Sequence, residues 1–541
     1  MQVPGELGVV FQKGAQLSAS NSLQPFLMLF TALLVVLSTW RWLRTWGSAG
    51  HGPPGPLPWP ILGNALQLGT SPHLALSRLA QRYGPVFALK LGSRNVVVLS
   101  GSKIIRQTLV KQGSDFADRP DFPSFRMISG GRSLAFGTYG PVWKLHRRVA
   151  QSVVRRFSTK NVGALQVLEK HVVAEVGQLI RILLSSCERE TFVEPTRNLV
   201  VAVGNIMSAV CFGTRYEHSD DEFKRLLSHN ERFGKTVGAG SLVDMMPWLL
   251  RFPNPVRTGF RGFRDLNEEF SAFVRNKVAQ HRDTYKRDTV RDMTDSFIDV
   301  IDSGRATSDG GVSLTPEYVE SSMTDVFGAS QDTLSTALTW IFLLLVRYPD
   351  VQRQVHAEID RVVGRGRLPE LGDEPHLVYT AAFIFEAMRF SSFIPVTIPH
   401  AASTDTCIRG FRVPKGTVVF VNQYSVNHDP EIWRQPDRFD PSRFLTAAGD
   451  AVDKDLVNKV LIFSMGRRRC IGEALSKVQL FVLTSVLLHQ CELRANPTES
   501  PSMEHTYGLT LKPKPFTVNV RIRDRFMGEA FTKAATVHVP T

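Results

Sequence analysis

Cysteine is scarce in this sequence, and acidic residues are outnumbered by basic ones. The five cysteines among 541 residues stand far apart, so neither a disulfide scaffold nor a cysteine-rich zinc module is expected, and a reducing compartment fits better. Internal repeats and low-complexity tracts are lacking after the first 60 residues. The 43% hydrophobic content excludes a disordered chain and a coiled-coil rod. A net charge of +14 predicts an anionic partner, either a membrane surface, a nucleic acid or an acidic protein.

A long uncharged stretch runs from residue 14 to residue 40 near the N-terminus. Its apolar part, about residues 23–40, approaches the roughly 20 residues that a membrane-spanning helix needs. Arg41 and Arg44 follow it among tryptophans, which suits the cytoplasmic boundary of a membrane. A cleaved signal peptide is the alternative, but it carries its basic residues before the apolar stretch, where only Lys13 stands here. We therefore expect residues 1–46 to be an N-terminal anchor, with the rest of the chain in the cytosol.

Residues 47–60 are rich in proline, which fixes φ and removes backbone donors. They predict a stiff linker between the anchor and a catalytic body, with an ordinary loop as the alternative. We expect one large domain over residues 61–525 and a C-terminal tail over 526–541.

The domain is predicted to be mainly α-helical with small β-sheets. Residues 87–92 and 96–99 indicate a hairpin, and residues 417–421 and 516–520 indicate further strands. A long helix is expected from Thr315 to Tyr348, with Thr315 as its cap, Pro316 in its first turn and Pro349 ending it. At 1.5 Å per residue this helix would be roughly 48 Å long, enough to cross the whole domain.

One cysteine stands in an unusual setting, between glycines and arginines and just before a helical pattern. Backbone N–H groups and the helix dipole stabilise a thiolate at such a position, although a lone cysteine is more often an inert buried residue. The surrounding pattern consists of Phe463, Gly466, Arg468, Cys470 and Gly472. It resembles the haem-binding loop of cytochromes P450. That resemblance implies that Cys470 is the axial thiolate ligand of haem iron, that Arg468 pairs with a haem propionate and that Phe463 shields the sulfur.

Glu386 and Arg389 lie three residues apart, so an ordinary surface ion pair is the simplest interpretation. Together with Arg443 they resemble the P450 structural triad, a buried network that supports the haem loop. Between them, His400 ends a segment that resembles the P450 strand whose last basic residue binds a propionate. Trp143 and Arg147 similarly resemble the Trp-x-x-x-Arg pair that binds the other propionate. The order of these motifs resembles the P450 family from about residue 53 to residue 525.

Polar residues interrupt the apolar pattern of the long helix. Asp325, Ala329 and Thr333 share one face, and Asp332 adds a carboxyl group beside the Thr333 hydroxyl. From spacing alone, a threonine bonded to its own helix with the aspartate facing solvent is the simpler interpretation. The resemblance instead implies an acid–alcohol pair that relays protons to dioxygen. Ser330 departs from the general P450 motif, which has glycine there and a helix kink.

Longer segments, including residues 228–234, 238–244, 327–338 and 390–400, resemble family 1, most like subfamily B, with subfamily C as a near neighbour. This implies flat lipophilic substrates: oestrogens and other steroids, retinoids, polyunsaturated fatty acids and polycyclic aromatic xenobiotics. Aromatic rings suit planar substrates, and a few polar groups could hold a hydroxyl, although core packing and helix capping are alternative roles for the same residues. The expected substrate contacts are Ser133, Phe136, Asn230, Phe233, Asn267, Asp325, Gly328, Ala329, Ile394, Ile398 and Leu509.

The resemblance thus implies a membrane-bound haem-thiolate monooxygenase that takes oxygen from O2 and electrons from NADPH through P450 reductase. A haem-thiolate hydroperoxide isomerase or dehydratase is the alternative, as a main or a side activity. A nucleic-acid partner is not expected, because no nucleic-acid module is recognisable. The endoplasmic reticulum membrane is the expected location, and the mitochondrion stays open as a second one.

The positive charge is concentrated where a redox partner would bind. No acidic residue interrupts the run from Lys144 to Lys160, and in the P450 fold this helix shares a face with the haem loop. The run therefore predicts docking of the acidic NADPH–cytochrome P450 reductase, with cytochrome b5 as a further candidate partner. The expected docking residues are Lys144, Arg148, Arg155, Arg156, Lys160, Arg467 and Arg469.

Overall fold

The computed structural model describes residues 52–160, 162–217, 220–236, 242–287, 289–307 and 311–523. Most of the predicted anchor and all of the predicted tail lie outside the described residues. The anchor positions that are described are helical and exposed, namely Pro25, Met28, Leu29, Phe30, Ala32, Leu33 and Val36.

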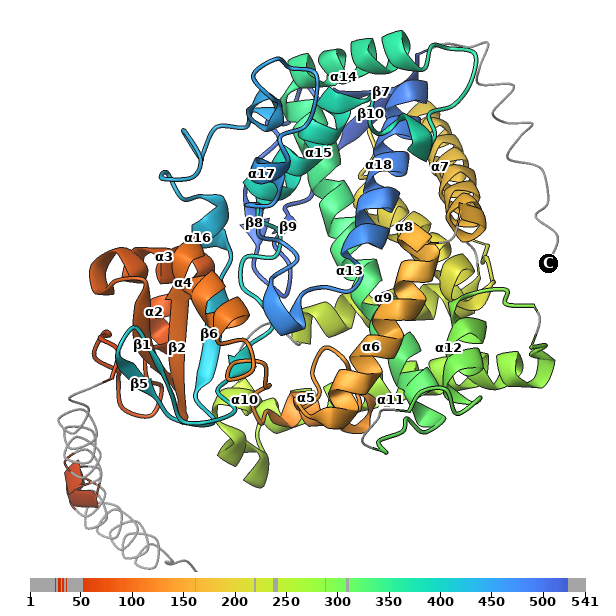
Figure 1. The fold of residues 1–541 in the computed structure, drawn as a ribbon. Helices are drawn as coiled ribbons and strands as arrows, with labels where there is room; N and C mark the ends of the chain where they lie inside the picture. The colour runs from red at the N-terminus through yellow and green to blue at the C-terminus, as the bar shows by residue number, and fades with distance from the viewer. Residues whose placement is uncertain are drawn as a thin grey trace, which may run out of the picture.

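Helices dominate the described residues, which confirms the predicted fold class (Figure 1). The helices are α2 Ala65–Leu68, α3 Pro72–Tyr83, α4 Ser102–Arg106, α5 Pro123–Met127, α6 Pro141–Arg155, α7 Val162–Glu190, α8 Thr196–Phe212, α9 Asp221–Thr236, α10 Leu242–Met245, α11 Pro255–Thr284, α12 Met293–Ile301, α13 Glu317–Arg347, α14 Pro349–Val362, α15 Val378–Ser391, α16 Tyr424–Asn427, α17 Lys454–Val457 and α18 Glu473–Gln490. Short 3-10 or π-helical turns are η1 Gln107–Lys111, η2 Ile128–Gly131, η3 Arg156–Lys160, η4 Pro247–Arg251, η5 Leu371–Asp373, η6 Pro441–Phe444 and η7 Gly466–Arg468.

The largest sheet has four strands in the order β1-β2-β6-β3 and lies to one side of the helices (Figure 1). The predicted hairpin is confirmed, since β1 Val86–Leu91 and β2 Arg94–Ser100 pair antiparallel with Leu91 opposite Arg94. Beside β2 runs β6 Val418–Asn422 in parallel, followed by β3 His400–Ala401. The two-stranded sheets are β4 Thr406–Ile408 with β5 Phe411–Val413, β7 Cys491–Ala495 with β10 Val518–Ile522, and β8 His505–Thr506 with β9 Lys512–Pro513.

The last strand begins at Val518 and not at Phe516 as predicted. The reason is a side chain that competes with the strand partner: the Thr517 backbone N–H donates to the Glu499 carboxylate at 3.1 Å. Pairing with β7 therefore starts at Val518, two residues later than predicted.

The predicted long helix is present as α13, which has 31 residues and an expected length of about 46 Å. Its start was predicted slightly too early, because Pro316 is the capping residue and the Thr315 side chain does not cap the helix. Among the described residues, α13 is the one helix long and apolar enough to cross a membrane, yet 78% of its most apolar window is buried. It is therefore the spine of the core.

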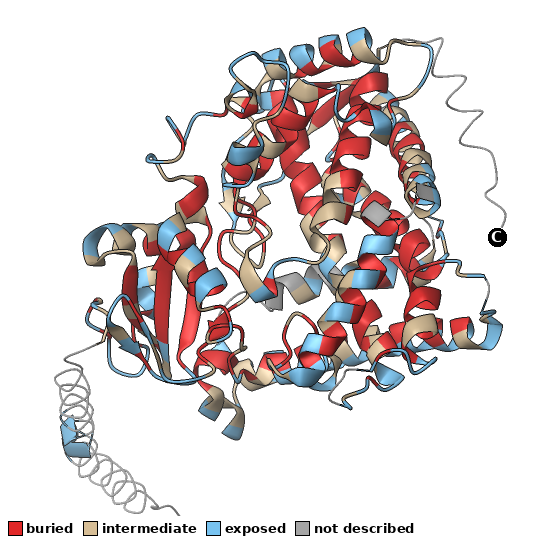
Figure 2. Ribbon diagram, viewed as in Figure 1, coloured by how far each residue is buried: buried red, intermediate tan, exposed pale blue. Residues whose placement is uncertain are grey.

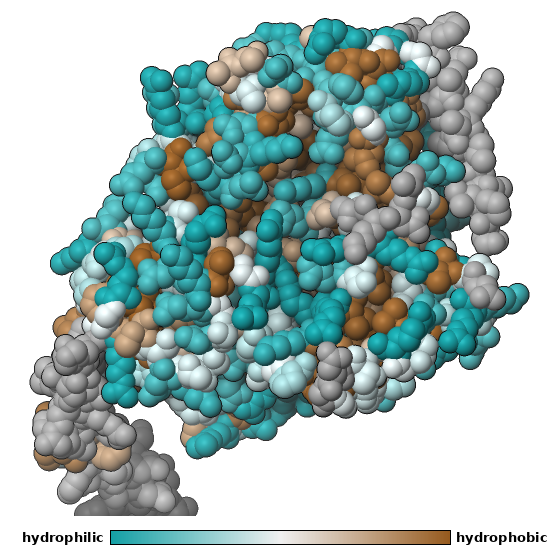
Figure 3. Space-filling model, in the orientation of Figure 1, coloured by the Kyte–Doolittle hydropathy of each residue, from teal (hydrophilic) through white to brown (hydrophobic). Residues whose placement is uncertain are grey.

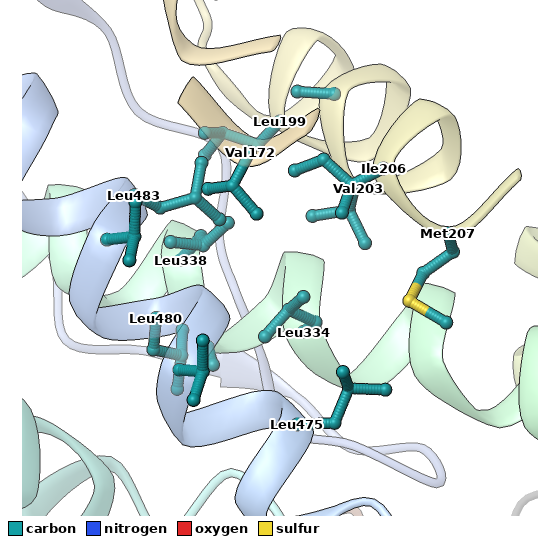
Figure 4. Packing of buried hydrophobic residues seen from close by; sticks show 14 of the residues in the cluster. Val172, Leu199, Val203, Ile206, Met207, Leu334, Leu338, Leu475, Leu480 and Leu483 are labelled. Carbon is teal, nitrogen blue, oxygen red and sulfur yellow. The ribbon is translucent and has the colours of Figure 1, made fainter. Parts of the chain in front are cut away.

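Figure 2 shows that buried residues concentrate in α13, in α18 and in the strands of the large sheet. In Figure 4, Leu334 and Leu338 of α13 interdigitate with Leu475, Leu480 and Leu483 of α18, and with Val203, Ile206 and Met207 of α8. The face seen in Figure 3 is mostly hydrophilic, with apolar side chains scattered over it. The packing of α13 between α8 and α18 fixes which of its residues face the cavity described below.

The proline-rich segment is part of the folded body over its second half. The Pro54 carbonyl accepts from the Ala88 N–H at 2.7 Å, and the Asn64 side chain donates to the Leu57 carbonyl at 3.1 Å. A side chain at Gly55 would lie 2.0 Å from the Ala88 oxygen. The extended linker that we predicted over 47–60 must therefore end before Pro54.

Candidate active site

A cavity of about 340 Å³ lies between α13, the 133–137 segment, the 393–400 segment and the Cys470 loop. Most of the residues expected at the active site border it, from both the cofactor set and the substrate set. Those residues are Phe136, Arg147, Phe233, Asn267, Asp325, Gly328, Ala329, Asp332, Thr333, Ile394, Ile398, His400, Phe463, Arg468, Cys470, Gly472 and Leu509. Ser133, Trp143 and Gly466 do not border it, and the side chain of Asn230 lies outside the described residues.

The Cys470 loop is a tight turn that leads into α18. The Cys470 N–H donates to the Phe463 carbonyl at 2.9 Å, and Gly472 caps α18. Gly466 has a φ of 73°, and a Cβ there would lie 1.9 Å from the Leu109 oxygen. The expected role of Gly466 in binding the cofactor is therefore better described as a backbone requirement, since no other residue fits this turn.

The Cys470 side chain has its exposed surface on the cavity. Burial raises the pKa of its thiol, the Gly472 N–H lowers it, Glu473 raises it, and Arg147 and Arg469 lower it. We expected the arginines and the helix start to stabilise the thiolate, but burial outweighs them. A bound metal cation would supply the missing stabilisation, because a thiol that coordinates a metal is deprotonated.

Positively charged groups crowd one end of the cavity. Arg468 donates to the carbonyls of Ala117, Leu134 and Gly137 at 2.6–2.9 Å, and its guanidinium lies 3.8 Å from the centre of the Trp143 ring. Burial and Arg119 hold the pKa of Arg468 well below its ordinary value. The Trp143 indole N–H donates to the Leu134 carbonyl at 3.0 Å, which is not the propionate contact that we expected from it.

Arg119 is a member of this cationic group that the sequence motifs did not reveal. It donates to the carbonyls of Ala135, Ile398 and Pro399 at 2.7–2.9 Å and borders the cavity. Burial lowers its pKa to about 9, with Asp118 opposing and Arg147 adding to the shift. Arg119 stands alone before a proline, so no spacing signal could have identified it.

His400 lies beside these arginines and its Nδ1 donates to the Phe116 carbonyl at 2.8 Å. Burial, with Arg119 and Arg468 nearby, holds the pKa of His400 well below its ordinary value. Because Nδ1 is engaged, Nε2 can donate to an anion only when the ring is protonated. A bound anion would raise the pKa towards that state.

Two acidic residues line the cavity, Asp325 and Asp332. Their carboxylates bind Ser133 and Lys512 and do not pair with these arginines. The cations therefore lack carboxylate partners within the cavity, and buried charge without a partner is costly. A ligand with carboxylates at this end and a metal at the sulfur would satisfy both requirements, so the donor set fits haem with its two propionates.

Glu386, Arg389 and Arg443 form a buried ion-pair network away from the cavity. The Arg389 guanidinium meets the Glu386 carboxylate at 2.6 Å and Arg443 meets it at 3.1 Å. Arg389 also donates to the Asn427 carbonyl at 2.8 Å, and the Asn427 side chain bonds both the N–H and the carbonyl of Leu461. The network thus reaches the segment that enters the Cys470 loop.

The polar residues of α13 differ in what they contact. The Thr333 hydroxyl donates to the Ala329 carbonyl at 2.9 Å. The threonine is thus bonded to its own helix, which is the interpretation that its spacing alone favoured. Asp332 does not face solvent: it accepts from Thr510 at 3.0 Å and pairs with Lys512 at 2.5 Å. The Ser330 hydroxyl donates to the Phe327 carbonyl, and α13 continues through this position as one helix.

Two expected substrate contacts bind each other. The Ser133 hydroxyl donates to Asp325 at 2.7 Å and accepts from the N–H groups of Ala135 and Phe136, and the Leu134 N–H also donates to Asp325. Burial raises the pKa of Asp325 to about 6, although these hydrogen bonds lower it. In this structure their hydrogen bonds fasten the cavity wall to α13, and the expected contact of Ser133 and Asp325 with a substrate hydroxyl stays a prediction.

The remaining walls are apolar and aromatic. Phe136 packs on Phe125, and Phe233 packs on Phe263, with ring centres 4.8 and 5.8 Å apart. Phe270, which we had not predicted, borders the cavity and covers Gly328.

Two polar residues of the cavity wall, Asn267 and Thr397, differ in whether their side chains have a hydrogen-bond partner. The Asn267 amide donates to the Phe263 carbonyl of its own helix at 2.7 Å. Thr397 was also missed, and its buried hydroxyl has no hydrogen-bond partner among the described residues. An unpartnered buried hydroxyl on a cavity wall can bind a polar group of a ligand.

The predicted docking residues lie on α6, η3 and the Cys470 loop. Lys144, Arg148, Arg155, Arg156 and Arg467 are exposed, and the side chain of Lys160 is outside the described residues. Arg469 is exposed as well and pairs with Glu473 at 2.7 Å, and its role in docking stays a prediction. Basic residues that we had not included, Lys103, Arg106 and Lys111, lie on α4 and η1, and η1 contacts η7 of the loop.

The cysteine, the buried cations and the apolar walls define a haem-thiolate enzyme as the class of protein. The chain matches the cytochrome P450 family over residues 53–520. It is 56% identical to human cytochrome P450 1B1 over 476 residues, which cover 87% of each protein, and 53% identical to the mouse protein of that name over 514 residues, 94% of each. It is 43% identical to human cytochrome P450 1A1 over 464 residues, 85% of this chain and 90% of that protein.

The chain therefore belongs to the cytochrome P450 family and is a monooxygenase of that family. Its identity to the 1B1 proteins exceeds that to 1A1, which confirms the expected likeness to subfamily B. Membership of the family implies haem as the cofactor.

Proposed function

We propose that the protein binds haem b and hydroxylates flat lipophilic molecules with O2 and electrons from NADPH. The observation that carries this proposal is the position of the Cys470 sulfur and of buried cations on one apolar cavity, whose described lining residues offer these cations no carboxylate partner. Cys470 would ligate the iron, and Arg119, Arg147, His400 and Arg468 would meet the propionates. Bound haem supplies the iron at which dioxygen is activated.

The chain itself would bind the substrate, exclude water and deliver protons. Asp332 would take up a proton at its carboxylate on the cavity edge, and the Thr333 hydroxyl would pass it inward after leaving the Ala329 carbonyl. The presence of this pair on the cavity favours monooxygenation over the isomerase or dehydratase alternative, which takes its oxygen from a hydroperoxide already in the substrate.

The cavity suits oestrogens and other steroids, retinoids, polyunsaturated fatty acids and polycyclic aromatic xenobiotics. Phe136, Phe233 and Phe270 offer ring faces and edges to a planar molecule. Thr397 offers a hydroxyl to a polar substituent. The aliphatic part of the wall comes from Ile394, Ile398 and Leu509.

We also propose attachment to the endoplasmic reticulum membrane by the N-terminal anchor. Exposed apolar side chains continue from it on the folded body, at Trp59, Ile61 and Leu66. Trp248 and Phe252 are exposed too, and their segment is tied to the same region by hydrogen bonds from Gly92 to Leu62 and from Ser93 to Met245. An exposed apolar surface of this kind indicates contact with a lipid surface or a protein.

The basic face formed by α6, α4 and the Cys470 loop would receive NADPH–cytochrome P450 reductase, and cytochrome b5 is a second candidate for it. Lys144, Arg148 and Arg467 are exposed there. Complementary charge accelerates such encounters, so reduction of the protein should slow as salt is raised.

A spectrum and an activity assay test the function together. The reduced, CO-treated protein should show the absorption band of thiolate-ligated haem, and Cys470→Ala should lack it. With reductase and NADPH, the wild-type protein should hydroxylate oestradiol, retinol or a polycyclic hydrocarbon. Absence of the band in the wild-type protein would refute the proposal.

A further inference from the structure

Asp332 is held by two residues from a distant part of the chain. Thr510 donates to one carboxylate oxygen at 3.0 Å, and the Lys512 ammonium meets the other at 2.5 Å. Thr510 lies between β8 and β9, and Lys512 is the first residue of β9. Both are about 180 residues from Asp332 along the chain.

The three residues form a gradient from solvent to the cavity. The Lys512 side chain is 39% exposed and that of Asp332 is 11% exposed, while Asp332 borders the cavity. Thr510 is fully buried, at 1% exposure. The ammonium group therefore lies on the solvent side of the carboxylate, and the carboxylate lies between it and the cavity.

This arrangement is fastened to the core on both sides. The Trp340 indole of α13 donates to the Leu511 carbonyl at 2.7 Å, and the Leu511 N–H donates to the Phe393 carbonyl at 2.8 Å. The Thr510 hydroxyl is also 3.4 Å from that of Thr336, one turn along α13. The bonds of Thr510 and Leu511, the two residues that precede Lys512, keep its backbone beside Asp332.

We propose that Lys512, supported by Thr510, is a positioning residue for proton delivery: it orients the Asp332 carboxyl group towards the cavity and connects it with solvent. This inference rests on the proposed role of Asp332. Hydroxylation consumes one substrate R–H, one O2, two electrons and two protons, and yields R–OH and water. The Asp332 carboxylate takes up a proton from solvent on the Lys512 side and passes it to the cavity, so it returns to the ionised state that pairs with Lys512.

Loss of this connection changes how the electrons are used. The two electrons and two protons that would give product and water instead reduce O2 to hydrogen peroxide. Lys512→Met removes the charge and keeps most of the side-chain volume. We expect the ratio of peroxide to product to rise about tenfold or more, the kinetic equivalent of one charged hydrogen bond. The solvent deuterium isotope effect on product formation should also increase, since proton delivery becomes slower.

Lys514 provides the matched control. It lies two residues further along the chain, is half-exposed, and pairs with Glu504 on the surface. Lys514→Met should leave both readouts at the wild-type value, and Lys512→Arg should restore most of the wild-type coupling. A purely structural role of Lys512 would lower the amount of folded protein without moving the isotope effect.

The proposal is overturned if Lys512→Met matches Lys514→Met in both the peroxide ratio and the isotope effect while Asp332→Asn is impaired. If Asp332→Asn is also unaffected, the proposed role of Asp332 fails first, and that of Lys512 with it. Should Lys512→Met not bind haem, Thr510→Val serves instead. It must shift both readouts in the same direction by a smaller factor, and unchanged values overturn the proposal.

Discussion

The two ends of the cavity treat charge in opposite ways. At the end near Cys470, Arg119, Arg147 and Arg468 approach one another with their carboxylate partners missing from the cavity wall. Further along α13, the Asp332 carboxylate has its own partner, Lys512. Asp325 lies nearer the cationic end, since it and Arg468 both bond Leu134, and it is held by Ser133. The first end is completed only by an anionic ligand. The second is complete without one, and it leaves an apolar space for a lipophilic molecule.

The largest expected effect is at the cationic end. Arg468→Ala removes three hydrogen bonds to buried carbonyls and one partner for the cofactor, and hydrogen bonds of a charged group contribute about 1.5–3 kcal/mol each. The haem content of the purified protein should fall at least about tenfold, measured by the thiolate-haem band per mole of protein.

Arg467→Ala is the control for that change, because Arg467 is the exposed neighbour of Arg468. It should retain its haem. Equal retention by both variants would show that the buried cations do not hold the cofactor, and the contrast between the two ends would disappear.

An effect of intermediate size is expected at Asp325, as a dependence of stability on pH. Its folded pKa is raised from about 3.8 to about 6, so its contribution to stability is present below the unfolded pKa and is lost as the pH rises through 6. Compared with Asp325→Asn, the wild-type protein should therefore lose stability between pH 4 and pH 7, as followed by the unfolding temperature. A difference between the two proteins that stays constant over this range would show that burial does not disfavour the Asp325 charge.

The smallest effect is expected in the apolar part of the wall. Thr397→Val removes a hydroxyl group that has no partner among the described residues, so folding should hardly change. KM should rise about fivefold for a hydroxylated substrate such as oestradiol, in line with about 1 kcal/mol for one hydrogen bond, and stay the same for an unsubstituted polycyclic hydrocarbon. Equal changes for both substrates would assign Thr397 to general packing.

Sequence reasoning identified residues that belong to short local patterns and missed those that depend on contacts across the chain. The Cys470 loop and the Glu386–Arg389 pair lie in such patterns, and their order along the chain resembled a known family. Arg119 and Lys512 have no such pattern, because contacts with residues far along the chain, Ile398 and Asp332, place them at the cavity. A similar distance separates Ser133 from Asp325, whose hydrogen bond joins positions 192 residues apart and was not predicted.

The mainly helical fold class, the β1–β2 hairpin and the long helix α13 were predictable, because they follow from hydrophobic periodicity and from the positions of prolines. Single residues at element ends were not. The Glu499 carboxylate delays the start of β10, and the hydrogen bonds of Pro54 and Asn64 draw the proline-rich segment onto β1. Both are side-chain or loop contacts that no local pattern reports.

The Glu386 network has a consequence for how this enzyme can change over evolutionary time. It supports the entry of the Cys470 loop through Asn427 and Leu461, and none of its three charged members borders the cavity. Substitutions in the aromatic and aliphatic walls can therefore accumulate without altering the segment that presents the sulfur. A new substrate preference can arise in such a protein while its catalytic chemistry is inherited intact.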